Sequence, residues 1–292
     1  MKHGLRRFVT LLILGLITYS GFSQSETNTL KYDTKYYEAV DRWVAFPKTD
    51  STFFYGFLYI DNSAGFTFDY SGDAKIIDNG LKVVSERTET ISQKVRLDIK
   101  TKDVAILSNE QVSSLQLPAI PDWLATYKMG SDSVDFLKNL GYHYNHVGAS
   151  HLALEPLKEA YEKEPHYKGL EFELAYAYNA LKQYEKAIVV LDKAIENDPD
   201  EYYFYRELGF AYRYLDQLDK AETIYKKGIS ISDNDFEKSE MAVNMAQAYF
   251  LLQNREKFDE WAKITRKYAE KGSRYDQFID VFEEKWGQEI KN

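Results

Sequence analysis

Three histidines near the middle of the chain are the first residues whose types and spacing suggest chemistry. His143, His146 and His151 lie close together in the sequence, and neutral imidazole is the commonest metal ligand in proteins. The chain contains no Cys, however, and no carboxylate lies beside these histidines at the spacing of a known metal motif. We therefore predict that this cluster binds no metal.

A second candidate is the acidic run Asp233-Asn234-Asp235, which resembles the start of a calcium-binding loop. Such a loop needs Gly at its sixth position and a bidentate Glu at its twelfth. Here these positions are Lys238 and Asn244. The run is better interpreted as an acidic turn.

Motifs that would identify an enzyme are absent from the sequence. It has no Gly-rich phosphate loop, no nucleophile elbow and no paired-histidine zinc helix. We therefore expect no cofactor and no catalytic site. An enzyme of unrecognised type, with catalytic groups distant in sequence, remains an alternative, and a deep pocket that gathers several perturbed acids would support it.

The first 23 residues have the composition of an export signal. Lys2, Arg6 and Arg7 precede an apolar run from residue 8 to 19, and small residues follow, so we predict cleavage before Gln24. An uncleaved anchor is the alternative, but twelve apolar residues fall short of the roughly 20 that cross a bilayer. We expect a periplasmic or secreted protein with no membrane span after cleavage. Without Cys it has neither disulfides nor a cysteine-linked lipid.

The charge of the chain argues against nucleic acid as a partner. The net charge is −9, and removal of the three basic residues of the leader makes it −12. Nucleic-acid binders show basic patches, whereas Lys and Arg are scattered among acids here. Because the 24 Tyr and 17 Phe supply apolar area that offsets chain entropy, we expect a well-packed globular protein.

The region 24–117 has the pattern of a small antiparallel β-domain. Short apolar runs alternate with the turn signals 61–63, 71–73 and 78–80, which predicts strands at 42–46, 52–60, 65–70, 82–84, 95–99 and 104–107. The stretch 53–70 is dense in aromatic residues and is either an exposed ligand platform or sheet core. Phe66, Phe68 and Tyr70 alternate as residues on one face of one strand do, which favours the core.

Residues 118–133 are predicted to connect the β-domain to a second domain. Pro118, Pro121 and the run 130–133 (GSDS) break the strand pattern. A short helix is expected to begin within this linker, near 121–124.

Beyond residue 133 the period becomes helical and the sequence repeats itself. Three sets of residues recur every 34 positions: Leu140, Leu174 and Leu208; Tyr144, Tyr178 and Tyr212; Ala153, Ala187 and Ala221. Independent columns that agree on one register indicate a true structural repeat.

These columns resemble the tetratricopeptide repeat, a 34-residue helix-turn-helix unit with a Leu-Gly-x-x-Tyr core, spaced small residues and a closing Pro. The resemblance implies repeats at 134–167, 168–201 and 202–235, with Asp233 in place of the closing Pro of the third. A degenerate fourth unit is expected over about 239–272, with Phe258 and Thr265 at positions usually held by Ala. The predicted fold is therefore α+β and multidomain, with an all-α solenoid at 134–272.

The segment 273–288 is predicted to be a capping helix. Its apolar residues lie at i, i+3, i+4, i+7 and i+11, which forms one stripe on a helix: Tyr275, Phe278, Ile279, Phe282 and Trp286. Because a solenoid leaves its end faces open, such a helix would cover the last repeat. A docking site for a partner is the alternative use of this stripe.

The resemblance also implies a binding groove, because the first helix of each repeat lines a concave surface in the family. The register places these residues there: Lys138, Asn139, Tyr142, Asn145, His146, Phe172, Glu173, Tyr176, Asn179, Tyr203, Arg206, Glu207, Phe210 and Arg213. Of the three histidines only His146 falls on this face. The alternative is that these side chains are simply solvated or contact the protein's own N-terminal domain.

The expected partner is a segment of another protein. Some family members clamp the acidic tails of heat-shock chaperones with Lys and Asn at set groove positions. Lys138 matches one position, but Tyr142, Glu173, Tyr203 and Glu207 occupy the others. Two glutamates would repel a carboxylate, so we do not expect this ligand.

The leading hypothesis is an exported, non-enzymatic scaffold that binds a protein in the groove of its repeats. A rival hypothesis makes the β-domain a carbohydrate or small-ligand module that the repeats merely position. An exposed Trp43 or Tyr cluster on one sheet face would favour that rival, and a buried one would count against it.

Overall fold

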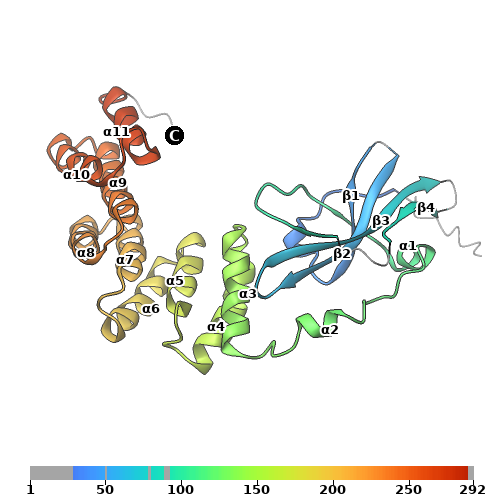
Figure 1. The fold of residues 1–292 in the computed structure, drawn as a ribbon. Helices are drawn as coiled ribbons and strands as arrows, with labels where there is room; N and C mark the ends of the chain where they lie inside the picture. The colour runs from blue at the N-terminus through green and yellow to red at the C-terminus, as the bar shows by residue number, and fades with distance from the viewer. Residues whose placement is uncertain (1–28, 50, 78–79, 89–92, 289–292) are drawn as a thin grey trace, which may run out of the picture.

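The protein consists of a β-sheet domain followed by a row of paired helices, as the computed structural model in Figure 1 shows. It describes residues 29–49, 51–77, 80–88 and 93–288. The predicted α+β organisation is thereby confirmed. The leader expected at 1–23 lies outside these ranges. None of the helices within them is long and apolar enough to cross a membrane.

All strand pairs of the sheet are antiparallel. The strand order is β4-β3-β2-β1-β6, and β5 pairs with β3. A tight turn joins the two longest strands, because Asp61 pairs with Gly65 across it. The bounds are β1 (Arg42–Pro47), β2 (Thr52–Asp61), β3 (Gly65–Ile77), β4 (Gly80–Glu86), β5 (Lys94–Arg96) and β6 (Ala105–Ile106).

The turn predicted at residues 71–73 does not exist, because β3 continues through it to Ile77. Gly72 is needed for close strand approach: a Cβ there would lie 2.4 Å from the backbone oxygen of Ser85 on β4. The pairing of β3 with β4 shifts register at Asp73, which is the mark of a β-bulge. Gly72 and Asp73 therefore mark a β-bulge within β3 and not a turn between two strands.

Both faces of the sheet are apolar. Alternate residues of β2, among them Phe57 and Tyr59, pack on one face with α1 (Asn109–Ser114) and α2 (Leu124–Tyr127). On the other face Leu58 and Ile60 pack with Phe66 and Phe68 of β3. The aromatic stretch 53–70 is therefore sheet core, with each face of its strands contributing to a separate cluster.

The connection at 118–133 packs against the sheet instead of running free. Its Leu124 is buried, and the Trp123 ring lies edge-on to Tyr59, with ring centroids 4.9 Å apart. The short helix expected near 121–124 is α2. Leu124 therefore belongs to the β-domain core, and Trp123 and Tyr127 pack against it.

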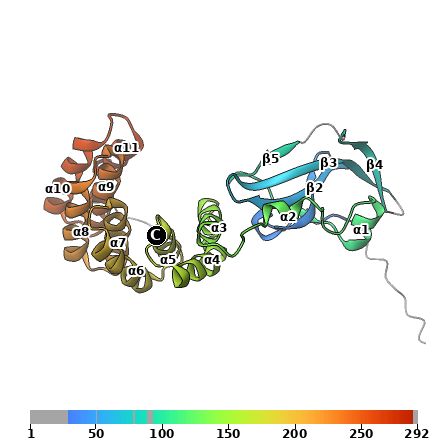
Figure 2. The ribbon, with the colours of Figure 1, turned by 60° about the horizontal axis from the view of Figure 1, so that its bottom comes forward.

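The helical part is built from antiparallel pairs. Figures 1 and 2 show the first helix of each pair in an inner row and the second helix in an outer row. Successive pairs meet chiefly where the second helix of one pair packs against the first helix of the next, and further contacts run along the inner row from α3 to α5, α7, α9 and α11. The pairs are α3 (Val134–His146) with α4 (Ser150–Lys163), α5 (Leu170–Ala180) with α6 (Tyr184–Asn197), α7 (Tyr202–Tyr214) with α8 (Leu218–Ile231), and α9 (Asp235–Leu251) with α10 (Arg255–Tyr268).

Repeated small residues set the approach of the two helices in a pair. A Cβ on Gly209 of α7 would lie 2.5 Å from the Tyr225 ring of α8. Ala153, Ala187 and Ala221 are fully buried on the second helices. Interiors this dense admit no extra methyl group without movement, so the 34-residue columns are packing positions.

The fourth pair is a true helix pair, although its sequence departs from the pattern. Helix α9 has 17 residues, whereas α7 has 13, which explains why Tyr249 follows Tyr212 by more than 34 positions. Phe258 and Thr265 are fully buried where the other repeats have Ala or Gly. Larger side chains fill the end of the solenoid.

Helix α11 (Arg274–Glu284) covers the last pair. Ile279 is fully buried, and Phe282 and Trp286 pack against the cluster that α9 and α10 form. Trp286 lies just beyond the helix end, and Phe278 remains partly exposed. Four residues of the predicted stripe therefore serve as a cap.

The β-domain meets the solenoid at the turn between α3 and α4. Phe66 of β3 lies edge-on to Tyr144, with ring centroids 5.5 Å apart, and Val147 and Ala149 join the same buried cluster. Burial raises the pKa of Tyr144 to about 12. The first repeat is therefore partly covered by the sheet.

Candidate binding groove

Helices α3, α5, α7 and α9 follow one another in the inner row of the solenoid (Figure 2). We use the word groove for the surface that the side chains on the inner side of these helices form. Fourteen residues were predicted to line it, and the structure divides them into two classes. Five are buried in its floor: Asn145, Glu173, Asn179, Glu207 and Arg213. The other nine, at least partly exposed, are Lys138, Asn139, Tyr142, His146, Phe172, Tyr176, Tyr203, Arg206 and Phe210.

The buried class joins neighbouring helices. The Asn145 amide on α3 donates hydrogen bonds of 2.9 Å to the backbone carbonyl and the carboxylate of Glu173 on α5. Asn179 on α5 makes the same pair of bonds to Glu207 on α7, each 3.0 Å long. Burial raises the pKa of Glu173, and the bond from Asn145 opposes this shift. We call these bonds the Asn–Glu ladder, and its members hold the groove together.

The exposed class is mainly aromatic. Tyr142 is 43% exposed and Tyr176, 34 residues later, is 38% exposed. Phe172 lies 5.4 Å from the Tyr203 ring and 6.3 Å from the Tyr176 ring, measured between centroids. His146 rests near Tyr142, with centroids 5.8 Å apart. Aromatic rings thus extend along three successive inner helices.

Arg206 lies at the centre of this aromatic row. Its guanidinium is 5.3 Å from the Phe172 ring and 5.0 Å from the Tyr203 ring. It also forms ion pairs with Glu207 at 3.1 Å and Glu237 at 2.6 Å. A planar guanidinium suits both kinds of contact. Arg206 is therefore fixed in place by its neighbours.

The carboxylates outnumber the cation at this point. Glu240 of α9 lies 3.8 Å from Arg206 and is the most exposed acid of the group. Burial raises the pKa of Glu240, Arg206 opposes the shift, and nearby Glu237 and Glu207 add to it. One guanidinium therefore faces three acids, and this part of the groove carries excess negative charge.

Sequence reasoning missed Glu237 and Glu240, since the repeat register breaks where α9 is lengthened. It also missed Tyr214, whose ring lies 4.5 Å from that of Phe210 and 5.4 Å from that of Tyr184. Tyr214 follows His146 by two repeat lengths. Carrying the His146 position forward by two repeats predicts a groove residue at 214.

The three histidines do not meet. His143 makes a 2.9 Å hydrogen bond with the backbone oxygen of Asn62 in the β-domain, and burial lowers its pKa. His151 lies instead beside Tyr37, with ring centroids 6.5 Å apart. Across the described ranges no three His, Asp or Glu residues are placed to hold a metal ion.

The β-domain contacts the first repeat without covering the groove aromatics. His143, Tyr144 and Val147 face the sheet, whereas Tyr142 and Tyr176 stay exposed. The rings of Tyr142 and Tyr176 are therefore not used to contact the N-terminal domain.

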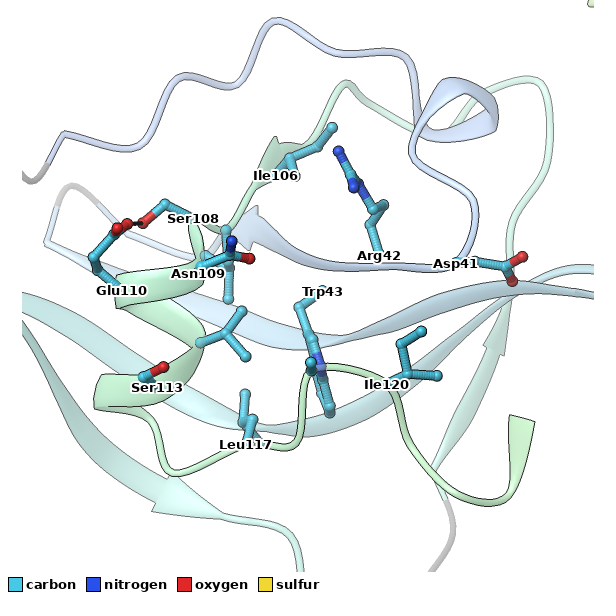
Figure 3. A pocket seen from close by; sticks show the side chains of 13 residues that line it. Asp41, Arg42, Trp43, Ile106, Ser108, Asn109, Glu110, Ser113, Leu117 and Ile120 are labelled. Carbon is cyan, nitrogen blue, oxygen red and sulfur yellow. Dashed lines mark hydrogen bonds between the residues drawn. The ribbon is translucent and has the colours of Figure 1, made fainter. Parts of the chain in front are cut away.

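A cavity of about 680 Å³ lies on the β-domain beside Trp43 (Figure 3). The Trp43 ring is only 7% exposed, and its indole N–H donates a 2.7 Å bond to the Pro118 carbonyl. Ser108 and Glu110, also in the lining, bond to each other at the start of α1. Because Trp43 is a buried structural residue, it offers no exposed platform for a carbohydrate.

Comparisons with known proteins agree with the repeat pattern. Residues 148–205 and 203–235 each match a family model described as tetratricopeptide repeat. Residues 148–235 are tetratricopeptide repeats. The resemblance expected from the sequence is thereby confirmed, and the matched repeats include α5 and α7 of the groove.

Solved tetratricopeptide structures are also similar to this chain. TTC0263 of Thermus thermophilus is 21% identical, with 55% of this chain and 86% of that one covered and a TM-score of 0.47. MamA is 24% identical over 50% of this chain and 84% of its own, with a TM-score of 0.44. PilF of Pseudomonas aeruginosa is 16% identical over 56% and 75%, with a TM-score of 0.43. A comparison with curated proteins gave no match.

Proposed function

We propose that this protein is an exported, non-enzymatic scaffold that holds a segment of another protein in the groove. One observation carries the proposal: aromatic side chains stay exposed on successive inner helices, with Tyr142 and Tyr176 more than a third exposed. Tyr is enriched at the anchor points of protein interfaces. Tetratricopeptide repeats present such residues on a rigid curved wall.

Rigidity of the wall favours binding. The Asn–Glu ladder fixes α3 to α5 and α5 to α7 from within. A receptor that is already ordered loses little conformational entropy when a partner binds. The exposed rings are therefore presented at constant spacing.

The chemistry of the groove favours a partner segment with both basic and apolar side chains. Glu207, Glu237 and Glu240 surround Arg206, so an incoming Lys or Arg would offset the excess negative charge. An acidic segment would meet repulsion at the same place. The rings of Phe172 and Tyr203 lie next to this charge and would receive apolar or aromatic groups.

Export is supported by the basic, apolar and small residues of segment 1–23. The non-enzymatic role is supported by the use of groove polar groups for structure, since Asn145, Asn179 and Arg206 already have partners. Catalysis would need such groups to be free to contact a substrate.

Selection of peptides from a displayed random library against the whole chain tests this function. We expect enriched sequences to combine Lys or Arg with aromatic or aliphatic residues. A chain with Tyr142→Ala and Tyr176→Ala should retain few of them, and Glu240→Gln should weaken the preference for basic residues. Enrichment of acidic peptides, or equal recovery by the double variant, would contradict the proposal.

A further inference from the structure

The second face of the sheet, the one that meets the solenoid, is left open at one end. Phe66 is covered by Tyr144 of α3, but further along the same face a cavity of about 870 Å³ opens to solvent. We call it the sheet-face cavity. Ligand pockets for small molecules commonly have volumes of roughly 300 to 1,000 Å³, so the space suits a small organic molecule.

Aromatic rings form the floor of the sheet-face cavity. Phe46 of β1 lies edge-on to Phe68 of β3, with centroids 4.9 Å apart, and Phe54 of β2 lies 6.0 Å from Tyr70. These strands are neighbours in the sheet, and all four side chains lie on the same face. A rigid strand backbone therefore presents a continuous apolar surface.

The rim of the sheet-face cavity is basic. Lys48, Arg96 and Lys102 contribute to the lining, and Asp73 is the only acid among the described lining residues. Asp73 is already occupied by Lys48 at 2.7 Å and by the hydroxyls of Tyr70 and Ser85. Lys102 has no carboxylate partner within the described part of the chain.

The sign of this rim is unusual for the chain, which carries a net charge of −9. Charged groups on a solvated acidic surface are normally interspersed. Here Lys48 and Arg96 are paired with Asp73 and Asp61, and the exposed Lys102, which has no described counter-charge, leaves positive charge beside the aromatic floor. That combination of charge and apolar area complements a ligand with an acidic group and an apolar body.

We propose that the sheet-face cavity binds a small organic anion whose apolar or aromatic body lies on Phe46, Phe54, Phe68 and Tyr70, with its acidic group toward Lys102. This site is independent of the groove. It also differs from the carbohydrate hypothesis for the β-domain, because acidic groups and apolar bodies, not hydroxyl arrays, are what the cavity matches.

Two fluorescent probes of nearly the same shape test the proposal on the whole chain. 1-Anilinonaphthalene-8-sulfonate is anionic, and N-phenyl-1-naphthylamine is its uncharged counterpart. We expect saturable binding of one sulfonate per chain, weakened by salt and displaced by dodecanoate but not by dodecyltrimethylammonium. Absence of saturable binding, or displacement by both amphiphiles alike, would overturn the proposal.

Matched variants locate the site. Lys102→Glu should weaken sulfonate binding about tenfold, since the charge near the ligand reverses, and leave the uncharged probe nearly unaffected. Lys100→Glu makes the same charge change at an exposed lysine outside the lining and should change neither. Val95→Glu, at an exposed lining residue, should weaken both probes. Equal effects of the two lysine variants, or unchanged binding in Val95→Glu, would place the probe elsewhere and refute the assignment.

Discussion

The side-chain amide of Asn179 bonds at 3.0 Å to both the carbonyl and the carboxylate of Glu207, 28 residues further along the chain. Asn145 holds Glu173 in the same way one repeat earlier. The bonds are buried, and each joins one inner helix to the next. This relationship fixes the spacing of the groove and leaves its exposed rings free to bind.

The Asn–Glu ladder gives the first prediction. Asn179→Ala should lower the free energy of unfolding by about 1 to 3 kcal/mol, because the buried carbonyl and carboxylate of Glu207 lose their donor. Urea unfolding followed by far-UV circular dichroism measures this. Asn139→Ala is the matched control, since its bond to Asp135 is exposed, and it should change stability by less than about 0.5 kcal/mol. Equal losses would show that the ladder is not a stabilising element.

Close packing within the repeats gives the second prediction. Gly209→Ala should cost about 1 to 3 kcal/mol, because the new methyl group meets the rigid, fully buried ring of Tyr225. Gly141→Ala should cost less: its neighbour is the flexible Leu157, and the second repeat already has Ala175 in the same cluster as Leu191. Thermal unfolding of both variants compares them. A larger effect at Gly141 would contradict this order.

The carboxylate of Glu222 predicts a pH dependence. Burial alone would raise its pKa, but hydrogen bonds from Trp261, Lys257 and Tyr249 lower it from 4.5 to about 2. A folded-state pKa below the unfolded value stabilises the protein fully above the unfolded pKa of 4.5, and the contribution disappears as the pH falls to about 2. Because this carboxylate is only partly buried and solvent screens part of the effect, the loss should be on the order of 1 to 3 kcal/mol.

Glu222→Gln checks this account. The variant should be less stable than the wild type at neutral pH, and its free energy of unfolding should change less between the unfolded and folded pKa values of the carboxyl, 4.5 and about 2. Urea titrations at several pH values give both curves. If the two curves stay parallel through this range, the shifted carboxylate is not Glu222.

A lysine ammonium that lies near three aromatic rings gives the fourth prediction. The ammonium of Lys94 on β5 lies 4.7 Å from the centroid of Tyr127 and 5.7 Å from those of Tyr59 and Trp123. Lys94→Gln should destabilise the β-domain by about 1 kcal/mol, as loss of an exposed cation–π site does. Trp fluorescence during urea unfolding reports it. Lys100→Gln, at an exposed lysine, should have little effect on stability. Equal losses of stability in Lys94→Gln and Lys100→Gln would show that the contact of Lys94 with the rings does not stabilise the β-domain.

Repetition and alternation made much of the fold predictable from the sequence. Leu, Tyr and Ala columns at 34-residue spacing gave the helix pairs, because each repeat buries the same positions. The alternation of Phe66, Phe68 and Tyr70 gave the face of β3 on which they lie. Both patterns can be recognised from the order of residues alone, without knowing which distant segments of the chain are in contact.

Features that depend on distant neighbours were not predictable. Gly72 and Asp73 read as a turn, yet β4 and Lys48 make them part of a bulged strand. The sequence pattern predicts Asn179 on the inner helix face, but only its contact with Glu207 on α7 shows that it is buried. Glu240 was missed because the lengthened α9 broke the register. The open end of the sheet depends on what the solenoid leaves uncovered.

Site-specific photo-crosslinking in the native host tests the central claim most directly. A benzoylphenylalanine is placed at Tyr176 in the groove, or at Val189, an exposed residue of the outer helix α6. We predict that position 176 captures one partner protein, that Tyr142→Ala reduces the yield severalfold, and that position 189 does not capture this partner. Capture of the same protein with equal yield from position 189, or capture from 176 of the chain's own N-terminal domain alone, would contradict the account.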